Sequence, residues 1–343
     1  MKHTKRRDLS AYEEAWSYLF FFGASLQQVL KFRRTYRNYL RICSSLLRGN
    51  FPINAILRDG SRITLNSNSA VQCIAEAQES RGFLYDMERD VLIITYPSPN
   101  KDSNAIIKFY GSMNSGEIIH IFSKELYGRL PVKGREVIDI GANIADSSIY
   151  FAVKGADRII GIEPLPKNYE IARKNIEVNN LSDKISLILG GCAGTSKQIR
   201  INSKIQDIEH CILSNHHTDD ISYEVAVSLF TLEDILEMGK IKSGAILKMD
   251  CEGCEYDSIL TANENVLKRF NHILIEYHYG YRKLKHKLEN SGFNVSITRP
   301  KALRRHYSDE FPNNKWMYSG YIYAENKSLY RRNVNDEISK TKY

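Results

Sequence analysis

The pattern of apolar and polar residues is clearest between Val137 and Gly155, in the stretch VIDIGANIADSSIYFAVKG. Its first four residues are mostly apolar and β-branched, and such a short run is typical of a strand buried on both faces. Gly141 then ends the strand, and polar residues precede apolar positions that repeat at helical spacing. The pattern predicts a strand, a turn and a helix whose first backbone N–H groups can face a ligand.

Four regions with different patterns divide the chain. Residues 1–50 predict two amphipathic helices, the first over Tyr12–Phe21 and a longer one after it. Residues 51–126 predict a small β-rich region, with a hairpin in ILRDGSRITL and strands in VLIITY, AIIKFYG and EIIHIF. Strands alternate with helical patterns in residues 127–330, which predicts a Rossmann-like α/β domain with helices on both faces of a mostly parallel sheet. Residues 331–343 form a charged tail.

The turn after the first strand of the α/β domain suits an adenosine-containing ligand without a diphosphate. A dinucleotide site needs the sequence G-x-G-x-x-G, but the turn reads GANIA and lacks the second glycine. Glu163 ends the next apolar strand, 24 residues after Asp139. At this spacing an acidic side chain can accept both hydroxyl groups of a ribose. An ordinary solvated glutamate at a strand end is the alternative interpretation.

Acidic residues gather at the ends of two further strands. Asp250, Glu252 and Glu255 fall within six residues at the end of the strand GAILKMD. Glu276 and His278 end the strand HILIEYH and alternate onto the same side. If the two strands are neighbours, their carboxyl ends meet at one edge of the sheet and these side chains line one pocket. Carboxylates this close repel one another, so at least one should have a raised pKa and accept a proton near neutral pH. For Glu255 alone we favour a helix cap.

The motifs of the α/β domain resemble one known family. VIDIGANIADSSIYFA, GIEPLPKNYEIARKNIEVNN, TLEDIL, LKMDCEGCEYDSIL and ILIEYH are similar to the FkbM family of S-adenosylmethionine-dependent methyltransferases. The resemblance covers about residues 127–324 and implies a class I methyltransferase fold, whose seven-stranded sheet contains one antiparallel strand. It also implies S-adenosylmethionine as cofactor and O-methylation of a hydroxyl on a sugar, a lipid-linked glycan or another small molecule. One departure is Ala145, which stands where the family has glycine.

The resemblance and the residue pattern together define two sets of site residues. The predicted cofactor-binding residues are Asp139, Gly141, Ala142, Asn143, Ala145, Asp146, Glu163, Gly191, Cys192 and Asp250. The predicted catalytic residues are Asp250, Glu252, Glu276 and His278. Methyl transfer to a hydroxyl needs a group that takes the proton, so we assign His278 or Glu252 as general base and Asp250 as the group that places the cofactor amine or the acceptor.

The acids and cysteines near the site could also indicate metal or redox chemistry. An oxygen-rich cluster can hold Mg²⁺, but we predict a site without metal. Cys251 and Cys254 form a C-x-x-C pair, and the chain has neither a second such pair for zinc nor a thioredoxin-like context around this one. We therefore interpret both as small residues at a strand–helix corner. Cys192, in the turn beside the predicted adenine, is interpreted as an apolar filler rather than a reactive thiol.

Composition and charge limit the remaining function classes. The chain of 343 residues carries a net charge of +8, which favours anionic partners. The basic residues 31–48 suit a membrane surface, or they form the solvated side of a helical cap on the catalytic domain. The six cysteines are too few for a disulfide scaffold, and no apolar run near the start is long enough to span a bilayer, so we expect a cytoplasmic protein.

Three other functions compete with O-methylation. A nucleic-acid (RNA) methyltransferase would suit the charge, but base-methylating enzymes often carry an Asn/Asp-Pro-Pro-aromatic run, and no two prolines are adjacent here. Clustered acids would also repel a phosphate backbone, so we predict no nucleic-acid partner. A non-catalytic protein that retains the fold is the second alternative. An NAD-linked oxidoreductase is the third, and the missing glycine argues against it.

Overall fold

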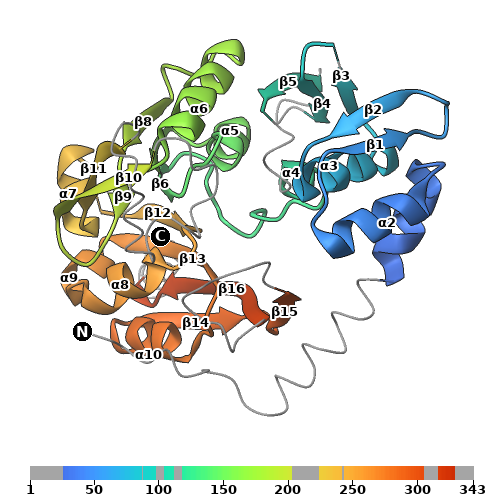
Figure 1. The fold of residues 1–343 in the computed structure, drawn as a ribbon. Helices are drawn as coiled ribbons and strands as arrows, with labels where there is room; N and C mark the ends of the chain where they lie inside the picture. The colour runs from blue at the N-terminus through green and yellow to red at the C-terminus, as the bar shows by residue number, and fades with distance from the viewer. Residues whose placement is uncertain are drawn as a thin grey trace, which may run out of the picture.

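The computed structural model describes residues 26–86, 88–97, 104–111, 118–202, 224–241, 243–304 and 316–328. The strands of its large central sheet are β6 (Glu136–Ile140), β7 (Arg158–Glu163), β8 (Ile185–Leu189), β12 (Ala245–Met249), β13 (Phe270–Tyr277), β14 (Phe293–Ile297), β15 (Lys301–Arg304) and β16 (Trp316–Asn326). Their order is β14-β16-β13-β12-β6-β7-β8, with β15 paired to β16 (Figure 1). Only β16 on this path runs antiparallel to its neighbours. The predicted seven-stranded, mostly parallel sheet with one antiparallel strand is therefore confirmed.

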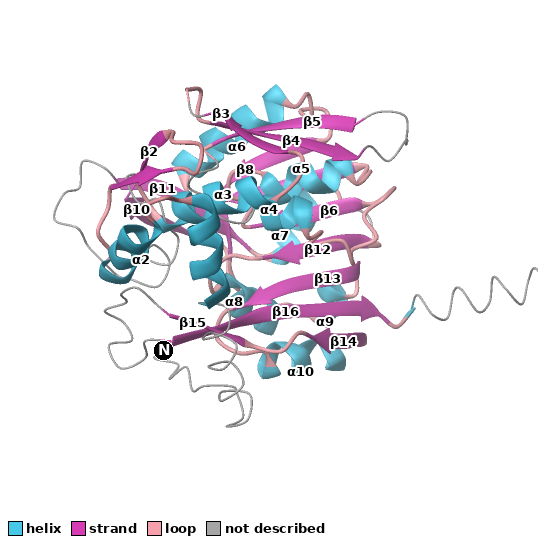
Figure 2. Ribbon diagram, turned by 90° about the vertical axis from the view of Figure 1, so that its right-hand side faces the viewer, coloured by secondary structure: helices cyan, strands magenta, loops and turns pink. Residues whose placement is uncertain are grey.

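Helices cover both faces of the sheet because alternate residues of each buried strand point to opposite faces. On one face, with Val137, lie α4 (Ile118–Ser123), α5 (Asp146–Val153) and α6 (Pro166–Val178). On the other face, with Ile138, lie α7 (Leu232–Met238), α8 (Cys254–Thr261), α9 (Glu264–Leu267) and α10 (Arg282–Asn290). Figure 2 shows the strands side by side with helices around them. Because an apolar cluster covers each face of the sheet, both sets of alternating residues are apolar, and the strands appear in the sequence as continuous apolar runs.

The register of the sheet brings the predicted site residues to one edge. Asp139 on β6 pairs with Lys248 on β12, one residue before each strand ends. Met249, the last residue of β12, pairs with Ile275 on β13. Gly141 and Asp250 therefore follow neighbouring strands at the same edge of the sheet. This carboxyl edge is where open α/β sheets bind ligands.

The region before the central sheet differs in part from its prediction. The expected hairpin forms from β1 (Ile53–Ile56) and β2 (Arg62–Leu65), and a second sheet contains β3 (Phe83–Asp86), β4 (Val91–Pro97) and β5 (Asn104–Tyr110). The predicted strand EIIHIF is instead helical over its residues 118–122, which lie in α4, and the helix α3 (Asn68–Glu79) was not predicted. The predicted long helix is interrupted: residues 26–35 are helical and α2 covers Tyr39–Arg48. Tyr36 instead pairs with Leu57 beside the hairpin.

A short run such as IIHIF is ambiguous because four of its residues are buried, so neither a strand nor a helix period is visible. β10 (Lys197–Asn202) and β11 (Glu224–Phe230) join β9 (Gly191–Cys192) in a third sheet. The helix predicted over Tyr12–Phe21 and the tail of residues 331–343 lie outside the described residues. The domain boundaries at residues 50, 126 and 330 stay predictions.

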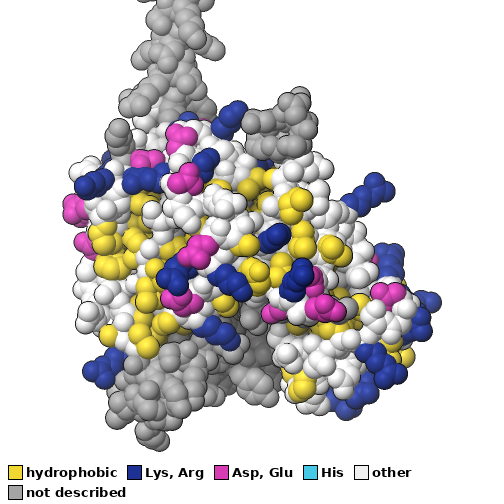
Figure 3. All heavy atoms as spheres, turned by 90° about the horizontal axis from the view of Figure 1, so that it is seen from above, with side chains coloured by type: hydrophobic (Ala, Val, Ile, Leu, Met, Phe, Trp, Pro, Cys, Tyr) yellow, Lys and Arg dark blue, Asp and Glu magenta, His cyan; other side chains and the backbone are white. Residues whose placement is uncertain are grey.

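Two surface features bear on partners. Within the described parts of the chain, no helix combines the length and apolar character that crossing a bilayer requires. On the face of the molecule in Figure 3, lysine and arginine side chains lie among acidic, hydrophobic and uncharged ones. The prediction of a cytoplasmic location goes beyond these observations and stays a prediction.

Candidate active site

The turn after β6 packs directly against the end of β12. Gly141 adopts a left-handed conformation with φ +77°, and a Cβ built on it would lie 1.8 Å from the carbonyl oxygen of Asp250. The backbone N–H groups of Gly141 and Ala142 both donate to the carbonyl oxygen of Ile162 on β7. Only glycine leaves room for this approach of two backbone segments. The turn predicted to hold the cofactor is therefore anchored to both neighbouring strands.

Ala145 also has a left-handed backbone, with φ +67°, and immediately precedes α5. Glycine adopts this conformation at no steric cost, which gives a physical reason for the glycine of the family pattern. The side chain of Ala145 is fully buried in the core next to α5. Its methyl group therefore packs among apolar side chains of the protein.

Asp139 is fully buried beneath the turn, with its ionic and hydrogen-bond partners around it. The hydroxyls of Ser147 and Ser148 each donate to Oδ2 at 2.6 Å, and Nζ of Lys248 lies 3.0 Å from Oδ1. Lys248 also donates to the carbonyl oxygen of Gly141 at 3.0 Å. Burial lowers the pKa of Lys248, but Asp139 and Asp250 outweigh this and raise it above its ordinary value. Lys248 therefore keeps its proton beside Asp139 and fixes the turn from below through the carbonyl oxygen of Gly141.

Sequence reasoning missed Lys248. Its only signal is a lysine in an otherwise apolar strand, AILKM, where an unpaired charge would be very costly. The predicted role of Asp139 in cofactor binding stays a prediction.

Glu163, the residue expected to hold the ribose, is fully buried at the end of β7. Its carboxylate accepts backbone N–H groups from Asn143 in the turn and from Leu165, both at 2.9 Å. Burial raises the pKa of Glu163 to about 7, although these hydrogen bonds act in the opposite direction. The side chain therefore points to the predicted cofactor turn and supports it, while its contact with a ribose stays a prediction.

The four predicted catalytic residues meet at the edge formed by β12 and β13. Nε2 of His278 lies 3.4 Å from Oε2 of Glu252 and 3.7 Å from Oδ1 of Asp250. The side chains of Asp250 and Glu252 are 20% and 32% exposed, whereas His278 is buried. The charge of Glu276 raises the pKa of Asp250, and the charge of His278 lowers the pKa of Glu276, so the three side chains lie near one another. The four side chains thus lie together at this edge of the sheet, where Asp250 and Glu252 are partly exposed.

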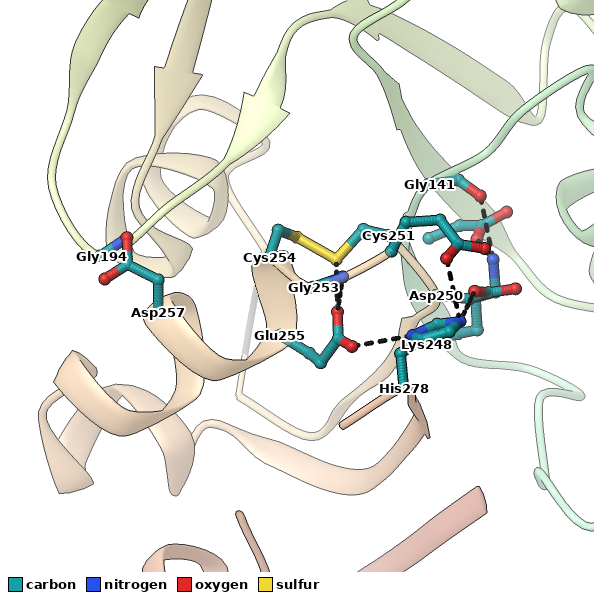
Figure 4. Close-up of a disulfide and its surroundings, with 12 residues drawn as sticks. Gly141, Gly194, Lys248, Asp250, Cys251, Gly253, Cys254, Glu255, Asp257 and His278 are labelled. Atoms are coloured by element: carbon teal, nitrogen blue, oxygen red, sulfur yellow. Dashed lines mark hydrogen bonds and ion pairs between the residues drawn. A yellow bond between two sulfur atoms is a disulfide. The ribbon is translucent and has the colours of Figure 1, made fainter. Parts of the chain in front are cut away.

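His278 is clamped between carboxylates on both ring nitrogens. Nδ1 lies 2.9 Å from Oε1 of the fully buried Glu255 (Figure 4). Burial lowers the pKa of His278, but Glu252 and Glu255 raise it well above its ordinary value. These carboxylates therefore favour the protonated form of the imidazole. The assignment of His278 or Glu252 as the general base stays a prediction.

Asp250 has the raised pKa that the crowding of acids predicts. Burial raises the pKa of Asp250 well above its ordinary value, and the negative charge of Glu276 adds to this. Lys248 and His278 oppose the shift without cancelling it. The pKa of Glu276 is also raised by burial. Asp250, partly exposed and with raised basicity, is the side chain best suited to accept a proton at this edge.

The two cysteines of the C-x-x-C pair form a disulfide between Cys251 and Cys254, at the corner between β12 and α8 (Figure 4). The interpretation of these residues as merely small was therefore wrong. Sequence spacing allowed a disulfide, but the strand–helix corner that brings the sulfurs together is a tertiary feature. Cys192 is buried, and burial raises the pKa of its thiol to about 12, in agreement with a filler role.

Two groups of side chains could hold a metal ion. The ligand atoms of Asp250, Glu252 and His278 lie within 4.8 Å of one another, as do those of Cys251, Cys254 and Glu255. The protonated imidazole of His278 would first have to lose a proton, and disulfide sulfurs are not thiolate ligands. The prediction of a site without metal stays a prediction. His210, His216 and His217 lie outside the described residues.

The central part of the chain matches a known family model. Residues 139–294 match the methyltransferase FkbM domain. The ribosomal protein L11 methyltransferase of Carboxydothermus hydrogenoformans is 31% identical over 91 residues, which are 26% of this chain and 30% of that protein. The chain therefore spans less than a third of this curated relative.

Solved structures of low sequence identity also match. A precorrin-6y C5,15-methyltransferase from Geobacter metallireducens is 14% identical, with a TM-score of 0.31 over 57% of this chain and 81% of that chain. The METTL16 methyltransferase domain is 15% identical, with a TM-score of 0.38 over 79% of this chain and 85% of that chain.

Proposed function

We propose that this chain, whose residues 139–294 match the methyltransferase FkbM domain, transfers a methyl group from S-adenosylmethionine to a hydroxyl of a sugar, a lipid-linked glycan or another small molecule. One observation carries the proposal. Asp250 and Glu252 lie partly exposed at the carboxyl edge of the parallel sheet, and the turn of Gly141 packs on the backbone of Asp250. The glycine turn that we assign to the cofactor therefore lies directly beside a carboxylate that can accept a proton. Methyl transfer to a hydroxyl requires both groups at one place.

The residues at this edge fit the cofactor. When bound, S-adenosylmethionine supplies a methyl group on a sulfonium centre that an acceptor oxygen can attack. Asn143 and Asp250 keep partly exposed side chains beside the turn, and Glu163 fixes the backbone of Asn143. The carboxylates of Asp250 and Glu252 favour a cationic ligand electrostatically. The buried members of the predicted set, such as Asp139, hold the turn in shape.

Asp250 takes the proton of the acceptor hydroxyl in this proposal. Its raised pKa makes it more basic than an ordinary carboxylate, and its side chain is partly exposed to solvent. Glu252, which is also partly exposed, orients the acceptor hydroxyl next to it. His278 stays protonated and keeps Glu252 and Glu255 in position. The general base is thereby assigned to a carboxylate and not to the histidine.

Calorimetric binding of S-adenosylhomocysteine to the full chain tests the cofactor. We expect binding to the wild type and binding at least about tenfold weaker in Glu163→Ala, because the support of the turn is lost. Glu170→Ala is the matched control, since Glu170 lies on α6 with a side chain 61% exposed, and it should bind like the wild type. No heat at millimolar ligand would favour a non-catalytic protein with this fold.

Transfer of a radiolabelled methyl group tests the acceptor class. Incubation of the full chain with labelled S-adenosylmethionine should label hydroxyl-bearing glycans, lipid-linked glycans or small metabolites in a panel. Asp250→Asn should abolish this label, whereas the control variant Glu170→Ala should retain it. Label that enters RNA but none of these acceptors would replace our proposal by the nucleic-acid alternative.

The N-terminal part of the chain supports an additional partner, an anionic membrane surface. Residues 26–65 contain eight lysines and arginines and only Asp59 as an acid, so they carry nearly the whole net charge of the protein. On α2, Leu40 and Leu47 lie two helical turns apart and are 68% and 74% exposed. Exposed leucines beside arginines are typical of a helix that lies in a membrane interface. Each basic residue near an anionic surface contributes about 1 kcal/mol to such binding.

Sedimentation with lipid vesicles tests this partner. The full chain should bind vesicles that contain phosphatidylglycerol more strongly than vesicles of phosphatidylcholine alone, and added salt should weaken the binding. Replacement of Leu40 and Leu47 by glutamate should remove it. Leu84→Glu changes a leucine that is 64% exposed on β3 and should have no effect. Equal binding to both kinds of vesicle, or loss of binding in the control, would refute the proposal.

A further inference from the structure

The disulfide closes a small loop that carries a residue of the candidate active site. Only Glu252 and Gly253 lie between Cys251 and Cys254, and both have left-handed backbones, with φ +55° and +119°. For glutamate this conformation costs roughly 1–2 kcal/mol, so the local sequence alone does not favour it. The cross-link removes the extended conformations that would relieve it. Glu252, whose carboxylate lies 3.4 Å from His278, is therefore held in place by the disulfide.

A second contact joins the sulfur atoms to His278. Sγ of Cys251 lies 3.4 Å from Oε2 of Glu255, which also accepts the backbone N–H of Gly253 at 2.8 Å. The other oxygen of Glu255 is the partner of Nδ1 of His278 (Figure 4). A disulfide sulfur has no hydrogen to donate, but a thiol at the same place can donate one to Glu255. The oxidation state of Cys251 therefore changes the hydrogen bonding of the residue that clamps His278.

We propose that Cys251 and Cys254 are a redox modification site, whose oxidised form holds Glu252 and Glu255 against His278 and whose reduced form releases Glu252. The modifying partner is a dithiol reductant. One of its thiolates attacks a sulfur of the disulfide and forms a mixed disulfide, and its second thiol then displaces the protein sulfur. The reductant leaves as a disulfide, and the protein gains two electrons and two protons as two thiols. Oxidation by a disulfide reagent reverses every step.

The loop between the two cysteines lies at the candidate active site. Cys251 and Cys254 are 5% and 6% exposed, and the two residues between them are partly exposed. Around His278 the charged groups are Asp250, Glu252, Glu255 and Glu276, and of these only Glu252 lies within the closed loop. Release of the loop thus moves one carboxylate away from the imidazolium and leaves the others on their strands and helix. Its consequence for methyl transfer rests on the proposed function, whereas the change at His278 does not.

The test uses the full chain with ¹⁵N-labelled histidine rings at constant pH, before and after treatment with dithiothreitol. Mass mapping should find the peptide with Cys251 and Cys254 as a disulfide in the untreated protein, and two thiols more per chain after reduction. Among the nine histidines, the signal of His278, assigned with the His278→Gln variant, should shift most on reduction. Oxidised dithiothreitol should restore both the disulfide and the signal. Binding of S-adenosylhomocysteine serves as the separate test of the proposed function.

Two variants and one structural measurement complete the design. The Cys251→Ser/Cys254→Ser variant should have the His278 signal of the reduced wild type and should not respond to dithiothreitol. Cys43→Ser removes a free, half-buried cysteine in α2 and should respond like the wild type. An unchanged His278 signal after reduction, or free thiols at both positions in the untreated protein, would overturn the proposal. Loss of the circular dichroism signal of the fold on reduction would equally overturn it, because the bond would then be a structural cross-link.

Discussion

Replacement of Gly141 by alanine separates two costs at the turn that the proposal places beside the cofactor. The added Cβ would meet the carbonyl oxygen of Asp250 at 1.8 Å and its carbonyl carbon at 2.8 Å, and both are backbone atoms that no rotamer change can move. A left-handed alanine costs roughly 1–2 kcal/mol, and overpacking of a tight site costs about 1–3 kcal/mol more. We therefore expect Gly141→Ala to lower the free energy of unfolding by about 2–5 kcal/mol.

Gly134→Ala is the matched control for this variant. Gly134 has φ +68°, close to that of Gly141, but no atom lies within 4 Å of a Cβ built on it. It should therefore show only the backbone cost of roughly 1–2 kcal/mol. Urea unfolding of both variants, followed by circular dichroism, measures the difference. If the two variants lose the same stability, the turn and the end of β12 are not packed as closely as the structure has them, and our account of the site fails.

Three further variants test the electrostatics of the site by urea unfolding. Lys248→Met leaves the buried Asp139 without its cation and should cost about 3–5 kcal/mol, and Asp139→Asn in the same chain should recover part of this; a loss below about 1 kcal/mol would contradict the ion pair. Burial raises the pKa of Glu163 from 4.5 to about 7, so the folded state keeps a proton that the unfolded state releases. The stability from this group is complete below pH 4.5 and lost as the pH rises through 7, and Glu163→Gln should remove that part of the pH dependence; an unchanged profile would refute it. Asp250→Asn should raise the stability at pH 7, because burial and Glu276 disfavour the ionised carboxyl, and lower stability would contradict the raised pKa.

Much of the α/β domain could be predicted from its sequence. The strands β6 and β7 are short β-branched runs buried on both faces, and glycine or proline marks the turns after them. The short apolar run of α4 was assigned to the wrong element because burial on all sides removes any visible period. Short buried runs with a glycine or proline turn directly after them were therefore assigned correctly, and the run in α4, which lacks such a turn, was not.

The composition of the candidate site could be predicted, but the state of its groups could not. Crowded acids within six residues indicated a raised carboxyl pKa, which Asp250 has. The raised pKa of His278 depends on Glu252 and on Glu255, and Glu255 reaches the opposite ring nitrogen from α8. No spacing in the sequence reveals that contact, because it joins a helix and a strand that only the packed sheet brings together. The same holds for Lys248 and its partner on the neighbouring strand.

The sequence by itself determined the strands β6 and β7, the glycine turn after β6 and the acids that end the strands, because these depend on local sterics and on the pattern of burial. Tertiary structure decided which charges pair, which imidazole holds its proton and which cysteines join. Those outcomes depend on distances of a few ångströms between segments far apart in the chain, and on the burial that makes each charge costly unless a partner lies beside it.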